Sequence, residues 1–259
     1  MTFHAVLDEV LTELRQEDGV QAIFLTGSVA RGEADEFSDL DVSVLVASET
    51  FVRNEVTYRS GVLLSVERST AAHRSRAFTE PETALWNLVS LQTGVPLHDP
   101  HGIFADLQTQ ARAVRWAELA ARADARAAAL LADSTEELHK VMGGLSAGND
   151  AKVAYACLGL TFSLGQVALL AAGTPLPSEN VFLTWARDAW ADAEWREAYG
   201  VLAGLGSGDV RARGHAALSA HRRAVALLRW TAGPEHELAQ AAAERAAAFL
   251  PGSPAVPTT

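Results

Sequence analysis

Gly27-Ser28-Val-Ala-Arg31-Gly32-Glu-Ala-Asp-Glu-Phe-Ser38-Asp39-Leu-Asp41 is the stretch that decides the fold of this chain, together with the apolar runs on either side of it. Before it, residues 20–25 form an apolar run that is too short for a helix and therefore indicates a buried strand. After it, the first half of residues 39–46 alternates between polar and apolar side chains, which is typical of a strand with one buried face. The stretch therefore predicts two strands joined by a polar, glycine-containing turn.

The turn and the second strand bring two kinds of chemical group together. Gly27 permits close approach of the backbone, and Ser28 adds a hydroxyl beside the turn amides, a combination that makes concavities for phosphate groups. Asp39 and Asp41 are two residues apart on a strand, so both carboxylates point to the face of Ser43, roughly 6.6 Å apart along the strand. Carboxylate oxygens are hard ligands that suit Mg²⁺, and a pair of ions ~3.5–4 Å apart can clamp an in-line phosphoryl displacement. The pattern predicts a phosphate cradle beside a pair of magnesium ligands.

The spacing Gly-Ser-x-x-Arg-Gly-x5-Ser-Asp-x-Asp resembles the signature of the polymerase-β-like nucleotidyltransferase superfamily. The resemblance implies that Gly27 and Ser28 hold the β and γ phosphates of a nucleoside triphosphate. It implies as well that Asp39 and Asp41 bind magnesium, with two ions expected. The fold it implies is α+β, with a mixed β-sheet that carries the site.

Two further positions of the pattern, Arg31 and Ser38, allow more than one interpretation. The resemblance makes them candidate nucleotide-binding residues that either touch phosphate or brace the loop. Ser38 can also simply start a turn, and Arg31 can bridge to Glu33 or Asp35, an exposed kind of ion pair that contributes little to stability.

A third strand is predicted over residues 61–68, where Ser65 and Glu67 share a polar face. The resemblance implies a third catalytic carboxylate on a later strand, and Glu67 is the candidate metal ligand by its position. The alternative is an exposed strand residue that pairs with a nearby arginine.

The chain changes character at about residue 105. Residues 3–14 follow the spacing of an amphipathic helix, residues 77–92 predict a helix, and residues 95–100 form a short edge-like segment. The core candidates on the second helix are Leu85, Leu88 and Leu91. We expect a nucleotidyltransferase catalytic domain over residues 1–105.

Residues 106–250 are alanine-rich and predict an all-α helical bundle domain, because long helical segments are separated by short glycine- and proline-containing breaks. One helix carries a continuous apolar stripe, formed by Val153, Cys157, Leu160, Leu164, Val167 and Leu170. Residues 251–259 are rich in proline and small residues and are expected to be a disordered tail.

Composition excludes several classes of function. Among the 259 residues, Asp and Glu number 32 and Lys and Arg 21, so the formal charge is −11, which repels phosphate backbones and anionic lipid. Cys157 is the only cysteine and permits no internal disulfide. The sequence starts without the features of a signal peptide, and no run reaches the ~18 uninterrupted apolar residues of a membrane span. We therefore expect a cytoplasmic protein that binds neither nucleic acid nor membrane.

Length and layout are similar to the antibiotic nucleotidyltransferases, the aminoglycoside and lincosamide enzymes. This resemblance implies transfer of a nucleoside monophosphate from ATP, or another triphosphate, to a hydroxyl of a small-molecule acceptor such as an aminoglycoside, with release of pyrophosphate. It also implies a role in antibiotic resistance and a homodimer. In the kanamycin-type enzyme a glutamate of the helical domain acts as general base, but Lys140 stands at that position here, and a lysine of ordinary pKa is protonated and cannot accept a proton. Glu136 and Glu137 are the remaining candidates for the base.

Two other classes of function are open. The chain could be an antitoxin-like enzyme that nucleotidylates a partner protein, although minimal proteins of that kind are shorter. It could also be an inactive nucleotide-binding regulator, although the intact Asp39 and Asp41 pair argues against lost activity.

Overall fold

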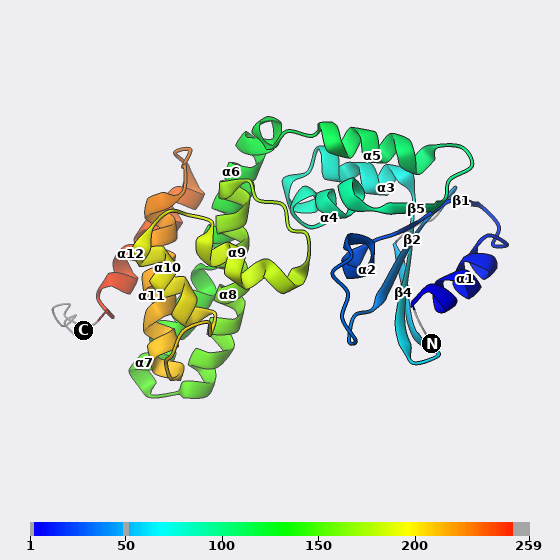
Figure 1. Cartoon of the computed structure of the whole chain (residues 1–259). Helices are drawn as coiled ribbons and strands as arrows, with labels where there is room; N and C mark the ends of the chain where they lie inside the picture. The colour runs from blue at the N-terminus through cyan, green and yellow to red at the C-terminus, as the bar shows by residue number, and fades with distance from the viewer. Residues whose placement is uncertain (1–2, 49–51, 251–259) are drawn as a thin grey trace. The chain divides into compact units, whose positions relative to one another are not determined.

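The computed structural model describes residues 3–48 and 52–250. The chain forms two compact units (Figure 1), which are Met1–Trp116 with Pro175–Ser178, and Ala117–Thr174 with Glu179–Thr259. The first unit holds a mixed sheet with helices and the second is helical, so the predicted α+β class is confirmed. The tail predicted over residues 251–259 lies outside the described residues.

The first unit is organised around a five-stranded sheet of order β3-β4-β2-β1-β5. Strand β1 (Val20–Leu25) is antiparallel to β2 (Leu40–Val46), and β2 is parallel to β4 (Val62–Ser69). The edges are β3 (Arg53–Arg59), antiparallel to β4, and β5 (Val95–His98), antiparallel to β1. The strand predicted over 20–25 therefore has the predicted bounds, and the segment after residue 94 is an edge strand as expected.

Helix α1 (Phe3–Leu14) determines which way the second strand faces. Its buried side chains Val6, Val10 and Leu14 pack into one core cluster with alternate residues of the strands, which are Ile23, Leu25, Leu40, Val42, Val44, Val46, Leu64 and Val66. Because successive strand residues point to opposite faces, the side chains of Asp41 and Ser43 must project from the other face of the sheet. Burial of the apolar side chains against α1 therefore places the alternate polar side chains of β2 on the opposite face of the sheet.

The opposite face is partly covered by helices that follow β4 (Figure 1). Phe24 stacks on Phe104 of α5 (Ile103–Ala113), with ring centroids 4.0 Å apart. The other covering elements are α3 (Ala71–Ser75), the short 3-10 helix Arg76–Phe78 and α4 (Pro81–Thr93). The helix predicted over 77–92 is therefore shorter at its start, because Pro81 occupies its first turn, but Leu85, Leu88 and Leu91 are buried as predicted.

Sequence analysis did not predict strand β3 or the short helices α2 (Gly27–Arg31) and α3. Strand β3 has mostly exposed residues on both of its faces, so its sequence lacks the alternation that marks a half-buried strand. The turn predicted after β1 contains the five-residue helix α2, which is too short to show a 3.6-residue period.

The second unit is helical throughout its described core. Its helices are α6 (Trp116–Asp133), α7 (Thr135–Ala147), α8 (Asp150–Ala172), α9 (Phe182–Asp188), α10 (Ala193–Leu202), α11 (Val210–Leu227) and α12 (Pro234–Ala247), with a 3-10 turn at Glu179–Val181. The predicted stripe of α8 is buried, since each of its six members is at most 1% exposed. Among the described residues α8 is also the one helix long and apolar enough to cross a membrane. However, 61% of its most apolar 18-residue stretch is buried, which is typical of a core helix.

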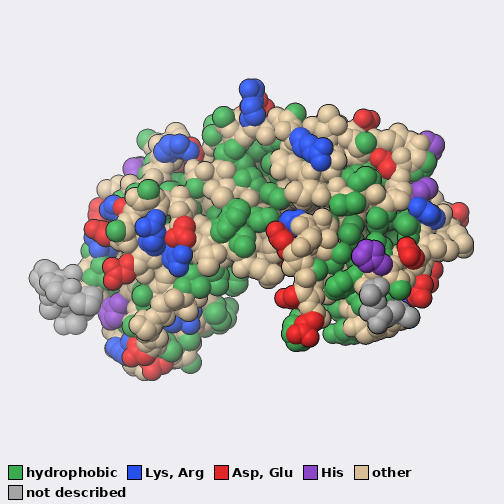
Figure 2. Space-filling view, viewed as in Figure 1, with side chains coloured by type: hydrophobic (Ala, Val, Ile, Leu, Met, Phe, Trp, Pro, Cys, Tyr) green, Lys and Arg blue, Asp and Glu red, His purple; other side chains and the backbone are tan. Residues whose placement is uncertain are grey.

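Charges of both signs are interspersed on the surface. On the face seen in Figure 2, lysine and arginine side chains are scattered among acidic ones and form no continuous basic tract.

A buried histidine makes the helical unit sensitive to acid. His221 of α11 is 0% exposed, and among the described residues neither ring nitrogen has a hydrogen-bond partner. Burial of the ring lowers the pKa of His221 to about 4. The polar backbone of Leu131 acts in the opposite direction but has the smaller effect on this pKa. Because this pKa lies below the unfolded value of about 6.5, the unfolded state binds more protons in the interval, and stability is lost as the pH falls from about 6.5 towards 4.

We expect this histidine alone to lower the free energy of unfolding by about 2 kcal/mol when the pH is lowered from 8 to 5. His221→Leu removes the titrating group, so the variant should lose that part of the pH dependence. Denaturant unfolding followed by tryptophan fluorescence at both pH values measures it. The control is His139→Leu, at an exposed position of α7, which should retain the wild-type slope. Equal slopes for His221→Leu and wild type would contradict the prediction.

Candidate active site

The glycine turn after β1 lies directly against the second aspartate of the motif. Gly27 has φ +69°, a left-handed conformation that favours glycine, and a Cβ built there would overlap Oδ2 of Asp41 and lie 3.0 Å from its Cγ. The backbone N–H of Thr26 donates a hydrogen bond of 3.0 Å to the backbone carbonyl of Asp41. Two predicted parts of the site, the turn with Gly27 and the strand with Asp41, are therefore in contact.

Asp41 lies within electrostatic reach of the two other predicted carboxylates, Asp39 and Glu67. The parallel register sets Asp41 beside Ser65 and Ser43 beside Glu67 on the same face of the sheet. Burial raises the pKa of Asp41 to about 6, repulsion from Asp39 and Glu67 adds to the rise, and Arg31 opposes it. The face therefore concentrates negative charge around a largely buried carboxylate.

Glu67 has an ion-pair partner that sequence analysis did not name. Oε1 of Glu67 lies 3.0 Å from Nη2 of Arg74, whose residue is 5% exposed. Burial lowers the pKa of Arg74, and the charge of Glu67 opposes that shift. The interpretation of Glu67 as the partner of a nearby arginine thus describes this structure. No pattern in the sequence marks Arg74, because the contact joins a five-residue helix, α3, to a strand.

A divalent cation fits the donor set of Asp39 and Asp41. Both offer hard carboxylate oxygens, and a cation would relieve the repulsion from neighbouring carboxylates that adds to burial in raising the pKa of Asp41. Within residues 3–48 and 52–250, however, no group of three His, Cys, Asp or Glu side chains is arranged to hold a metal ion. Asp39 and Asp41 thus supply the kind of donor that a divalent cation takes, whereas Glu67 is ion-paired with Arg74.

Arg31 and Ser38 brace the loop that joins the turn to β2. Nε of Arg31 lies 2.8 Å from Oε2 of Glu33, and its Nη1 donates a 3.0 Å hydrogen bond to the carbonyl of Pro177. The Ser38 hydroxyl donates to Oδ1 of Asp35 at 3.0 Å and accepts from the Asp35 N–H at 2.9 Å. The Arg31–Glu33 pair and the Ser38 turn are the alternatives named above for these two residues, and the bond from Arg31 to Pro177 adds a contact outside the loop.

The candidate bases of the helical unit are both ion-paired. Nζ of Lys140 lies 2.8 Å from Oε1 of Glu136 and 3.0 Å from Oε1 of Glu137. The hydrogen bond from Lys140 lowers the pKa of Glu136, and the two glutamates raise the pKa of Lys140. A lowered pKa makes Glu136 a weaker proton acceptor, so the general base has no assignment.

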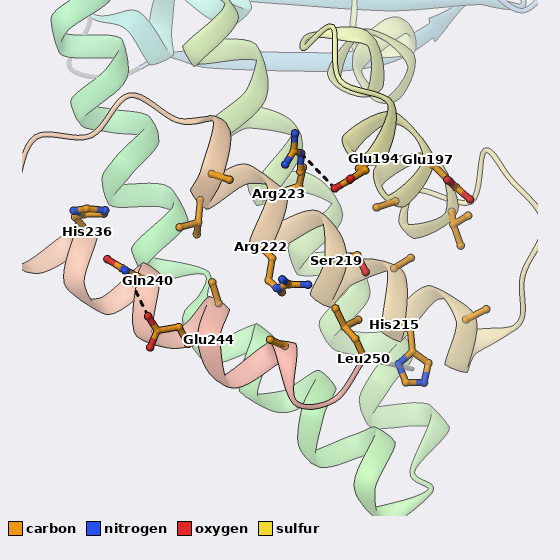
Figure 3. Close-up of a pocket in the computed structure, with 18 residues that line it drawn as sticks. Glu194, Glu197, His215, Ser219, Arg222, Arg223, His236, Gln240, Glu244 and Leu250 are labelled. Atoms are coloured by element: carbon orange, nitrogen blue, oxygen red, sulfur yellow. Dashed lines mark hydrogen bonds and ion pairs between the residues drawn. The ribbon is translucent and has the colours of Figure 1, made fainter. Parts of the chain in front are cut away.

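The helical unit contains a cavity of its own, of about 990 Å³, between α10, α11 and α12 (Figure 3). Of its 18 lining residues, eight are alanine or valine and nine are polar or charged. Two of its charged side chains, Arg223 and Glu194, lie 3.7 Å apart and offset each other. It contains none of the residues of the nucleotidyltransferase-like pattern.

Comparisons with known proteins identify the domain that carries the site. Residues 7–81 match the family model described as "Nucleotidyltransferase domain". No curated protein matches the chain. Among solved structures, a nucleotidyltransferase-like protein from Exiguobacterium sibiricum is 16% identical, covering 95% of this chain and 78% of that one, with a TM-score of 0.49. The matched segment of the family model runs from within α1 to the first residue of α4, so it contains Gly27, Asp41, Glu67 and Arg74.

Proposed function

We propose that this nucleotidyltransferase domain is the catalytic part of a magnesium-dependent enzyme. It transfers a nucleoside monophosphate from ATP, or another nucleoside triphosphate, to a hydroxyl of a small-molecule acceptor, with aminoglycoside-like compounds as the first class, and releases pyrophosphate. The observation that carries the proposal is the contact of the Asp41 carboxylate with Gly27, which joins the candidate metal ligands to the candidate phosphate turn.

Each residue of the site has a distinct role in this proposal. The turn at Gly27 and Ser28 binds the β and γ phosphates and orients the leaving pyrophosphate. Asp39 and Asp41 would hold magnesium, with Glu67 as the third carboxylate, and the bound metal supplies Lewis-acid stabilisation of charge at the α-phosphate. Arg31 and Ser38 keep the intervening loop in shape through their contacts to Pro177 and Asp35.

The direct test is a thermal-shift panel of the four nucleoside triphosphates with and without Mg²⁺, followed by acceptor screening with α-labelled nucleotide. At least one triphosphate should raise the melting temperature in a Mg²⁺-dependent way, because a ligand that binds only the folded state stabilises it by its occupancy. Label should then appear on a hydroxyl compound, with kanamycin and lincomycin as the first probes. If no triphosphate raises the melting temperature at millimolar concentration, the proposal is wrong.

Ser28→Ala should weaken triphosphate affinity by about 10- to 150-fold, since a hydrogen bond to a charged group is worth about 1.5–3 kcal/mol. The matched control is Ser38→Ala, which loses a hydroxyl that already bonds within its own turn. That control should lower stability by about 1 kcal/mol and leave triphosphate affinity close to wild type. Titration calorimetry with the triphosphate and Mg²⁺ separates the two variants, and equal affinities for both would remove Ser28 from the phosphate site.

A further inference from the structure

Arg74 is a buried cation bound to residues of the site's own sheet face. Its Nε donates a 2.8 Å hydrogen bond to the Ser69 hydroxyl, and its Nη2 donates one of 3.2 Å to the Ser43 hydroxyl. The same Nη2 lies 3.0 Å from Oε1 of Glu67, and the guanidinium carbon lies 5.8 Å from the ring centroid of Phe24. The side chain is therefore held by β4, β2 and β1 together.

These contacts use the shape of a guanidinium and not only its charge. A planar fork can bond Ser69 with one nitrogen and reach Ser43 and Glu67 with another, whereas a lysine ammonium is a single point on a flexible stem. The Arg74 contact occupies Oε1 of Glu67. Glu67 is also 35% exposed, so part of its side chain remains open.

We propose that Arg74 is a positioning residue that orients Glu67 towards the cation held by Asp39 and Asp41. The inference rests on the proposed function, because it assumes that Glu67 is the third carboxylate. Arg74 acts through Glu67 and touches no substrate. Partners of this kind, hydrogen-bonded to a metal-binding carboxylate, typically change metal affinity or activity by 10–100-fold when they are mutated.

The chain offers a matched control in Arg68. It is also 5% exposed and also paired with a carboxylate, since its Nη2 lies 2.6 Å from Oε1 of Glu17. It follows Glu67 directly on β4, so its side chain leaves the sheet on the face of α1, away from the site. Arg74→Lys and Arg68→Lys therefore make the same change in equally buried arginines on opposite faces.

The experiment measures Mn²⁺ affinity of the full chain by electron paramagnetic resonance of the free ion, with melting temperature measured in parallel. Both Lys variants should melt at lower temperature than wild type. Arg74→Lys should weaken Mn²⁺ binding about 10–100-fold, and Arg68→Lys should stay within about threefold of wild type. Glu67→Gln should show a loss similar to that of Arg74→Lys, and the double variant should lose no more than Glu67→Gln alone, because the two residues act in series.

A second variant covers the case in which Arg74→Lys fails to fold. Ser69→Ala removes the hydroxyl that accepts from Nε of Arg74 and leaves Arg74 and Glu67 in place, so it should weaken Mn²⁺ binding about 3–10-fold. The positioning role would be overturned if Arg74→Lys bound Mn²⁺ with wild-type affinity. It would also be overturned if the loss of Mn²⁺ affinity in the double variant equalled the sum of the losses in the two single variants. If wild type binds Mn²⁺ through Glu67 and Arg74 yet transfers no nucleotide, the proposed function fails and the positioning role stands. If wild type binds no Mn²⁺, both fail.

Discussion

Asp41→Asn is expected to lower nucleotide transfer by about a thousandfold or more while making the metal-free protein more stable. The loss of activity follows because Lewis-acid stabilisation is worth several kcal/mol and each 1.36 kcal/mol is a factor of ten in rate. The gain in stability follows because the carboxylate of Asp41 is largely buried beside Asp39 and Glu67, which raises its pKa to about 6. An asparagine of the same shape carries no charge to desolvate.

The sign of the pH dependence follows from the raised pKa. Between the unfolded value of about 3.9 and the folded value, the folded state binds more protons, so stability falls as the pH rises towards 6 and the full penalty is present at pH 7.5. After allowance for partial exposure of the side chain, we expect Asp41→Asn to raise the free energy of unfolding by about 1–2 kcal/mol at pH 7.5 without metal. The gain should vanish at pH 4.

Pyrophosphate release and denaturant unfolding, each at pH 4 and 7.5 where the assay permits, check these expectations. Adding Mg²⁺ should raise the melting temperature of wild type and not of Asp41→Asn. The control is Glu36→Gln, an exposed acid of the loop that precedes β2, which should keep wild-type turnover. An Asp41→Asn variant that transfers nucleotide at the wild-type rate would show that the metal assignment is wrong.

Gly27→Ala should lower the free energy of unfolding by about 3 kcal/mol and reduce nucleotide transfer by at least about a hundredfold. A left-handed residue with a side chain costs about 1–2 kcal/mol, and overlap of the new Cβ with Oδ2 of Asp41 adds to that. The overlap can be relieved only by moving the Asp41 carboxylate or the turn, and a shift of about 1 Å at a reacting centre can reduce the rate about a hundredfold.

Gly32→Ala is the matched control for this prediction. Gly32 also has a left-handed φ, +72°, but a Cβ there would meet no atom within 4 Å. Gly32→Ala should therefore lower the free energy of unfolding only by the cost of a left-handed backbone with a side chain, about 1–2 kcal/mol, and leave turnover near wild type. Melting curves and pyrophosphate release are measured for both variants. The backbone strain is common to the two, so the difference between them reports the effect of the contact with Asp41. Equal losses of activity would mean that the contact of Gly27 with Asp41 is unimportant.

Local sequence was enough to predict the parts of the fold whose pattern repeats over a short distance. The strand over residues 20–25, the helix over residues 3–14 and the buried stripe of α8 each bury one continuous run or face, and burial imposes a period on the sequence. Strand β3 could not be predicted in this way, because both its faces are largely exposed and no apolar period is required of it.

The same distinction holds within the candidate site. The sequence by itself predicted a turn at Gly27 after a strand, and Asp39 and Asp41 on one face of the strand that follows, because turn chemistry and the two-residue period of a strand act between neighbours along the chain. In the structure β2 begins at Leu40, so Asp39 lies just before it. Only the tertiary structure decided that the Asp41 carboxylate lies on Gly27 and that Glu67 is paired with Arg74. Those contacts depend on the register of β2 against β4 and on where α3 packs, which are set by the burial of distant apolar side chains and leave no mark on the spacing of the residues that meet.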